Sequence, residues 1–154
     1  MARPAIIYCR ISRDTEGDFL GVARQERECR ELAAQCHLDV IDVAIDDDIS
    51  AYSGRHRPGY ERVLDAIKNS EVQALVVWAP DRLHRRPIEL EGFIDLVEAT
   101  GCRIYTVRSG EVDLSNEDGR MIARITGAVA RQESERKSAR LRAKHRELAA
   151  AGKP

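Results

Sequence analysis

A serine and several arginines stand where they could act together on a phosphodiester. Ser12 follows a short apolar run and comes two residues after Arg10, so both side chains point to the same face of an extended strand. A second arginine group, Asp-Arg-Leu-His-Arg-Arg at residues 81–86, follows another apolar run. Guanidinium groups bind phosphate oxygens in pairs and stay charged at physiological pH, and a serine hydroxyl can act as a nucleophile. These residue types predict phosphodiester chemistry.

The elements that would position these residues alternate between strand and helix. Short apolar runs predict buried strands, and apolar residues at helical spacing predict amphipathic helices. We expect strands at residues 4–11, 38–45, 74–78 and 103–107, loops at 14–21 and 49–57, and helices at 22–36, from 58 onward, 87–99 and 119–151. Strands separated by helices pair in parallel, with helices on the faces of the sheet. The predicted fold class is therefore α/β, a three-layer domain with a parallel sheet and a long C-terminal helix.

In such sheets ligands gather beyond the carboxyl ends of the strands. Ser12, the loop at 48–57 and the arginine group at 81–86 all follow predicted strands, so we expect them to form one site.

Other kinds of site have weaker support. Asp46, Asp47 and Asp48 could bind a divalent cation, but no second acidic cluster accompanies them, which favours a solvated turn. Ser12 lies in no GxSxG elbow, His84 is the only histidine near a predicted strand end, and no GxGxxG follows the first strand. We therefore predict neither a metal nor a cofactor.

Composition indicates one domain of an intracellular protein. The chain has 154 residues, 43% of them hydrophobic, which suits a single core. Its four cysteines follow no zinc-ligand spacing and are expected to be reduced thiols. There is no signal-peptide pattern and no apolar run of the ~18 residues that a membrane span needs. We expect a soluble protein of the cytoplasm.

The charge is distributed unevenly, and the last predicted helix carries the excess of positive charge. From Arg120 onward there are ten Lys and Arg against three Glu, a net charge of +7, whereas the preceding part carries −8. The helix has apolar residues in its first half and is basic at 136–146. Such a segment favours phosphates or a neighbouring subunit as partner, and a solvated overhang is the alternative. We expect residues 1–118 to form the α/β domain, 119–151 the long helix, and 152–154 the start of a linker to a further domain.

Six short motifs appear in an order that resembles the catalytic domain of the serine recombinases, the resolvase/invertase superfamily. They are residues 8–12 (Tyr-Cys-Arg-Ile-Ser), 24–26 (Arg-Gln-Glu), 48–54 (Asp-Ile-Ser-Ala-Tyr-Ser-Gly), 57–59 (Arg-Pro-Gly), 81–85 (Asp-Arg-Leu-His-Arg) and 130–136 (Ala-Arg-Gln-Glu-Ser-Glu-Arg). The wide spacing from Ser12 to Gln25, and the motif at 130–136, resemble the large phage integrases more than the small resolvases.

The resemblance implies site-specific DNA recombination, of the phage integration and excision type, through a 5′-phosphoserine at Ser12. It implies that arginines clamp the phosphate and that Asp81 orients an arginine or handles the leaving-group proton. The clamping residues would be Arg10, Arg57, Arg82 and Arg85; the supporting or DNA-binding residues would be Tyr8, Gln25, Ser50 and Arg140.

The resemblance also implies a location, the bacterial host cytoplasm in association with the nucleoid, and a set of partners. Double-stranded DNA with attachment sites would be the substrate, a homodimer would assemble into a tetramer on it, and a directionality factor is a further candidate partner. Apolar residues of the long helix would form the subunit interface: Met121, Ile122, Ile125 and Val129. Two alternatives stay open, a non-catalytic DNA-binding or assembly module and a metal-dependent phosphoesterase that uses residues 46–48.

Overall fold

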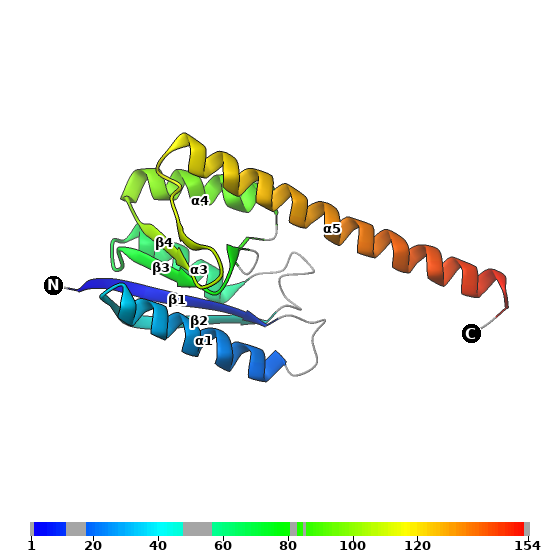
Figure 1. Ribbon diagram of the computed structural model, residues 1–154, viewed down its shortest axis with the longest axis horizontal. Coiled ribbons are helices and arrows are strands. Elements are labelled where there is room, and N and C mark those ends of the chain that lie inside the picture. Colours follow the sequence, from blue (N-terminus) through cyan, green and yellow to red (C-terminus); the bar gives the residue numbers. More distant parts are fainter. Residues whose placement is uncertain (1, 12–17, 48–56, 81–82, 85, 153–154) are drawn as a thin grey trace.

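The computed structural model describes residues 2–11, 18–47, 57–80, 83–84 and 86–152, and it contains one mixed sheet with helices on both faces (Figure 1). The strands are β1 (Arg3–Ile11), β2 (Leu38–Asp47), β3 (Ala74–Val77), β4 (Arg103–Thr106) and β5 (Gly110–Val112). The helices are α1 (Asp18–Gln35), α3 (Pro58–Lys68), α4 (Pro87–Thr100) and α5 (Glu117–Ala150). The predicted α/β class and the long C-terminal helix are confirmed.

The strand order in the sheet is β2-β1-β3-β4-β5. The first four strands pair in parallel, as predicted, whereas β5 runs antiparallel to β4. Strand β5 is not among the predicted strands, because Gly110, Glu111 and Val112 carry no apolar periodicity. This strand is set by a tight hairpin in which the Thr106 hydroxyl donates to the Gly110 carbonyl at 2.9 Å and accepts from the Ser109 N–H at 2.9 Å.

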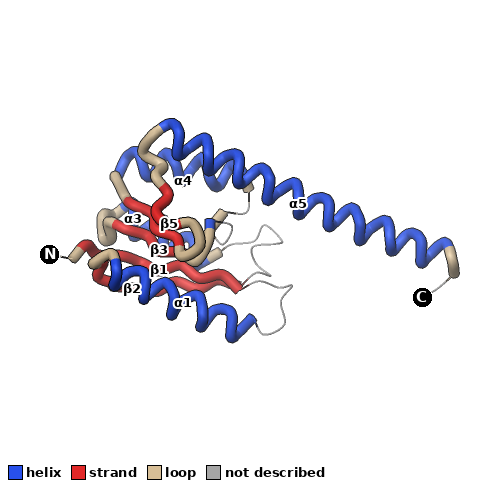
Figure 2. Tube along the Cα trace, in the orientation of Figure 1, coloured by secondary structure: helices blue, strands red, loops and turns tan. Residues whose placement is uncertain are grey.

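The two faces of the sheet are covered by different helices, which gives the three layers (Figure 2). The central strands β1 and β3 are buried on both sides, so their sequences are continuous apolar runs rather than alternating ones. On one face Cys29 and Ala33 of α1 pack near Ala5, Ile7 and Val76. On the other face α3 and α4 cover the alternate residues of the same strands, including Ile6, Tyr8, Leu75 and Val77.

Several element boundaries differ from the predicted ones. Helix α1 begins at Asp18, inside the predicted loop at 14–21, and β2 continues through Asp46 and Asp47. Helix α4 ends as Gly101 adopts φ 72°, a left-handed conformation that glycine tolerates best. Short polar stretches at element ends carry little periodicity, so a sequence pattern locates these boundaries poorly.

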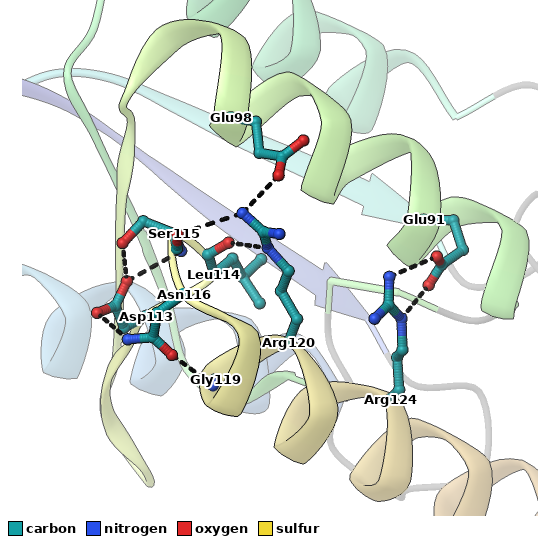
Figure 3. A network of polar contacts seen from close by, with 9 residues as sticks. All are labelled: Glu91, Glu98, Asp113, Leu114, Ser115, Asn116, Gly119, Arg120 and Arg124. Atoms are coloured by element: carbon teal, nitrogen blue, oxygen red, sulfur yellow. Dashed lines mark hydrogen bonds and ion pairs between the residues drawn. The ribbon is translucent and has the colours of Figure 1, made fainter.

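Helix α5 begins with a hydrogen-bonded turn and docks on α4 through two arginines (Figure 3). The Asn116 side chain accepts from the Gly119 N–H at 2.7 Å, capping the helix. Arg120 binds the Leu114 carbonyl at 2.8 Å and pairs with Glu98 at 2.5 Å. Arg124 and Glu91 form a bidentate ion pair with two N···O distances of 2.8 Å.

Beyond this contact, α5 extends away from the sheet (Figure 1). Its four apolar residues predicted for the interface are exposed rather than packed on the domain: Met121, Ile122, Ile125 and Val129. We call these four residues the apolar stripe. Within the described residues, no helix combines the length and apolar character needed to cross a membrane.

Candidate phosphate site at the carboxyl edge of the sheet

Three strands end at the same edge of the sheet, and side chains from two of them face α3. Strands β1 and β2 pair in register, with Arg10 opposite Asp46 and Tyr8 opposite Ala44. Tyr8 also lies beside Val77, the last residue of β3. The predicted site residues Ser12, Ser50, Asp81, Arg82 and Arg85 lie outside the described residues.

Asp46 is the centre of the described part of this edge. Its carboxylate accepts hydrogen bonds from the Tyr8 hydroxyl at 2.7 Å, from the Gly59 N–H at 2.7 Å and from the Tyr60 N–H at 2.8 Å. The side chain is only 3% exposed. A carboxylate at a helix N-terminus satisfies free N–H groups and interacts favourably with the helix dipole. Asp46 therefore caps α3 and is buried, so the expectation of a solvated turn is wrong for this residue.

Arg57 is the N-cap residue of α3 and is 6% exposed. Its Nη2 forms an ion pair with Oε2 of Glu89 in α4, and its guanidinium carbon lies 4.2 Å from the centroid of the Tyr60 ring. Nη1 of Arg57 is buried and has no hydrogen-bond partner among the described residues. An unpaired buried N–H group is costly, so this nitrogen is suited to receive an anion oxygen.

Arg10 is held through its backbone. Gln25, which is buried in α1, accepts from the Arg10 N–H at 3.4 Å and donates to the Arg10 carbonyl at 3.2 Å. These two hydrogen bonds join α1 to the carboxyl end of β1. Gln25 therefore holds in place the end of the strand that leads to residue 12. Arg10 itself is 6% exposed, so its charge acts in a low-dielectric environment.

Several titratable side chains in this region have shifted pKa values. Burial and the hydrogen bond to Asp46 raise the pKa of Tyr8, which stays a neutral donor. Burial raises the pKa of Cys9 to about 12, so its thiol is not a nucleophile at neutral pH. Burial lowers the pKa of His84 to about 4, so its imidazole is neutral. Among the described residues no group of His, Cys, Asp and Glu is arranged to hold a metal ion.

Comparison with known proteins agrees with this geometry. Residues 5–154 match the family model described as the resolvase N-terminal domain. The chain belongs to the resolvase family.

Curated relatives support the same assignment. The resolvase of transposon Tn2501 from Escherichia coli is 29% identical over 124 residues, which cover 80% of this chain and 59% of that protein. The serine recombinase PinR from Escherichia coli strain K12 is 27% identical over an alignment with the same coverage. The chain thus spans about 59% of the length of these relatives.

Solved structures share the fold at low sequence identity. A resolvase-family site-specific recombinase from Streptococcus pneumoniae has a TM-score of 0.65 at 17% identity, covering 98% of this chain and 99% of that one. The N-terminal catalytic domain of TP901-1 integrase has a TM-score of 0.59 at 21% identity, covering 86% of this chain and 98% of that one. These likenesses show that the resolvase-family fold extends over the long helix.

The structure brings together some of the predicted site residues and leaves one apart. Tyr8, Arg10 and Arg57 lie on the α3 side of the sheet edge, and Gln25 reaches the same strand from α1. Arg140 is exposed in the second half of α5, which extends away from the sheet (Figure 1). In this chain Arg140 does not join the other residues.

Three residues that shape the site are not among the predicted site residues: Tyr60, Glu89 and Asp46. Burial of Asp46 follows from its alternation with Ala44 on β2, a pattern the sequence does contain. The contact between Glu89 and Arg57 depends on how α3 and α4 pack, and no local spacing reveals it.

Proposed function

We propose that this chain is the catalytic domain of a site-specific serine recombinase of the phage integrase type, with Ser12 as the nucleophile. The Ser12 oxygen attacks a DNA phosphorus, the bond from phosphorus to the 3′-oxygen breaks, and a 5′-phosphoserine forms. One proton leaves the serine and one is taken up by the 3′-oxygen. Rejoining reverses these steps, so no nucleotide cofactor or metal is needed.

The observation that carries the proposal is the pair of buried arginines, Arg10 and Arg57, at the edge of the sheet where β1 ends just before Ser12. Arg10 precedes the serine by two residues, and Arg57 has a buried Nη1 without a partner among the described residues. Guanidinium groups fixed in advance stabilise the charge that develops on phosphate oxygens in the transition state. The buried Nη1 of Arg57 would be stabilised by an anion oxygen that accepts its hydrogen bond.

Residues beyond the described part complete the proposed site. Arg82 and Arg85 would bind the same phosphate, and Asp81 would orient one of them or handle the leaving-group proton. Ser50 would add a polar contact, with Tyr8 and Gln25 as supporting residues and Arg140 as a contact made in the assembled complex.

The phage type and the assembly are part of the same proposal. The TP901-1 integrase domain is among the similar structures, and the spacing from Ser12 to Gln25 favours the large integrases. The substrate would be double-stranded DNA with attachment sites in the bacterial cytoplasm. The apolar stripe of α5 would pair two copies, two dimers would form a tetramer on DNA, and a directionality factor would bias the reaction.

The test uses the polypeptide as its source encodes it, with supercoiled DNA of its source replicon, in EDTA and quenched with SDS. We expect DNA ends covalently bound to protein in the wild type and none with Ser12→Ala. A Ser12→Ala protein that still forms the adduct would overturn the proposal. So would free nicks that need magnesium and survive Ser12→Ala, which would move the chemistry to the aspartates.

A further inference from the structure

Four rings lie in a row, one of them in contact with Arg57. They come from β1, α3, α4 and the segment before α4. The Tyr8 and Tyr60 ring centroids are 6.0 Å apart, those of Tyr60 and His84 6.4 Å, and those of His84 and Phe93 5.1 Å. All three contacts are edge-to-face, with interplanar angles of 67°, 84° and 64°. This is a favourable geometry for aromatic pairs. We call these four residues the aromatic column.

The column touches the site through Tyr60. Its ring faces the Arg57 guanidinium at 4.2 Å, while Glu89 pairs with Nη2 of the same group. A planar guanidinium that is stacked on a ring and paired at one nitrogen has little rotational freedom. These two contacts fix the orientation of the guanidinium, and with it the direction in which the buried Nη1 points.

His84 acts in this arrangement through its ring shape rather than its charge. It packs between Tyr60 and Phe93, and its Nδ1 lies 3.5 Å from the Tyr60 hydroxyl, at the limit of a hydrogen bond. A neutral imidazole in this position fills space that a smaller side chain would leave empty. The Tyr60 ring would then be free to tilt away from Arg57.

We propose that the aromatic column positions Arg57, with Tyr60 in direct contact with the guanidinium and His84 holding the Tyr60 ring. The inference rests on the proposed function only in that Arg57 receives a DNA phosphate. Tyr60 and His84 are positioning residues, and neither is expected to exchange a proton with substrate. The column links Arg57 to His84, which stands between Arg82 and Arg85 in the sequence.

The test compares variants that lose a ring with variants that keep it. Tyr60→Leu and His84→Ala remove a ring, whereas Tyr60→Phe and His84→Phe keep a ring and remove the polar atoms. In single-turnover cleavage we expect the first pair to be slower by about 10-fold or more, with unchanged DNA affinity, and the second pair to stay within about 2-fold of wild type. Circular dichroism checks folding, and His84→Leu replaces His84→Ala if the latter does not fold.

A second readout needs no DNA cleavage. The Nε–H NMR signal of Arg57 in the ¹⁵N-arginine-labelled protein is assigned by its loss in Arg57→Lys. We expect it to shift in Tyr60→Leu and His84→Ala, and to stay near its wild-type position in Tyr60→Phe. For His84→Phe, where the neighbouring ring changes type, we expect one sharp signal.

The two readouts separate the two proposals. If wild type forms no Ser12-dependent adduct but His84→Ala, which keeps the Tyr60 ring, shifts the Arg57 signal, the recombinase proposal fails and the column still positions Arg57. If ring loss leaves the signal unchanged, the column proposal is overturned whatever the cleavage rate. Loss of cleavage in both Phe variants would also overturn it, because the polar atoms would then matter more than the rings.

Discussion

The carboxylate of Asp46 accepts a hydrogen bond of 2.7 Å from the backbone N–H of Gly59. This bond joins the carboxyl end of β2 to the first turn of α3. Because Arg57 is the N-cap residue of that helix, the contact also fixes the backbone that carries the buried guanidinium. The hydrogen bond between β2 and α3 thus helps to position Arg57.

Gly59→Ala should destabilise the domain. A Cβ at residue 59 would lie 2.8 Å from Oδ1 and 2.9 Å from Cγ of Asp46, so either the carboxylate or α3 must shift. Asp46 is buried and holds three hydrogen bonds, which leaves it little room to move. We expect a loss of about 1–3 kcal/mol in the free energy of unfolding, measured by urea denaturation.

Gly92→Ala is the matched control. Gly92 is exposed in α4, and an added Cβ would meet no atom within 4 Å. Alanine is favoured over glycine in a helix interior, so this variant should gain about 0.5–1 kcal/mol. Equal effects of the two substitutions would contradict the crowding at Asp46.

Acid should weaken the fold through His84. Its pKa is about 4 in the folded state, because of burial, and about 6.5 when unfolded. Between these values the unfolded chain binds a proton that the folded chain does not. Stability contributed by neutral His84 is therefore complete above pH 6.5 and is lost as the pH falls toward 4, by about 2–3 kcal/mol at pH 4.5.

His84→Phe isolates this contribution. The variant keeps a ring and cannot be protonated, while the acidic residues that titrate in the same range are unchanged. Urea denaturation of both proteins at pH 7.5 and pH 4.5 should show a smaller loss in the variant than in wild type. Parallel losses would mean that His84 is not buried in neutral form.

The central strands of the sheet could be predicted from the sequence because they are uninterrupted apolar runs. Residues 74–78 are apolar without interruption, which is typical of a strand buried on both faces, and the helices between strands require parallel crossovers. Strand β5 had no such signal, since its three residues gain their conformation from a hairpin bond at Thr106. The spacing of apolar residues indicates which residues are buried. It does not indicate a turn that depends on a single side-chain hydroxyl, such as that of Thr106.

The site was predictable only in part, for a related reason. Tyr8 and Arg10 lie two residues apart near the carboxyl end of β1, so their alternation places them on one face of the strand, and Gln25 reaches that strand from α1. The contacts of Arg57 with Tyr60 and Glu89 combine a first helical turn with the packing of a second helix. Such contacts arise from tertiary structure, and a single sequence does not contain their geometry.

Ile125→Arg should weaken self-association without unfolding the domain. Ile125 is 56% exposed and belongs to the apolar stripe of α5, whereas α5 contacts α4 through other residues, including Arg120 and Arg124. A charge in an apolar interface must be desolvated without a partner, which costs far more than the same charge in water. Sedimentation velocity over a range of concentrations should show a weaker dimer, with unchanged circular dichroism.

Thr126→Arg is the control for added charge. Thr126 is the exposed neighbour of Ile125 and lies about 100° further around the helix, at the flank of the apolar stripe rather than near its centre. It brings the same net charge to α5, so it should leave association close to wild type. If Ile125→Arg sediments as wild type at every concentration, the stripe is not the interface. If both variants weaken association equally, the cause is charge repulsion between the basic helices rather than loss of an apolar contact.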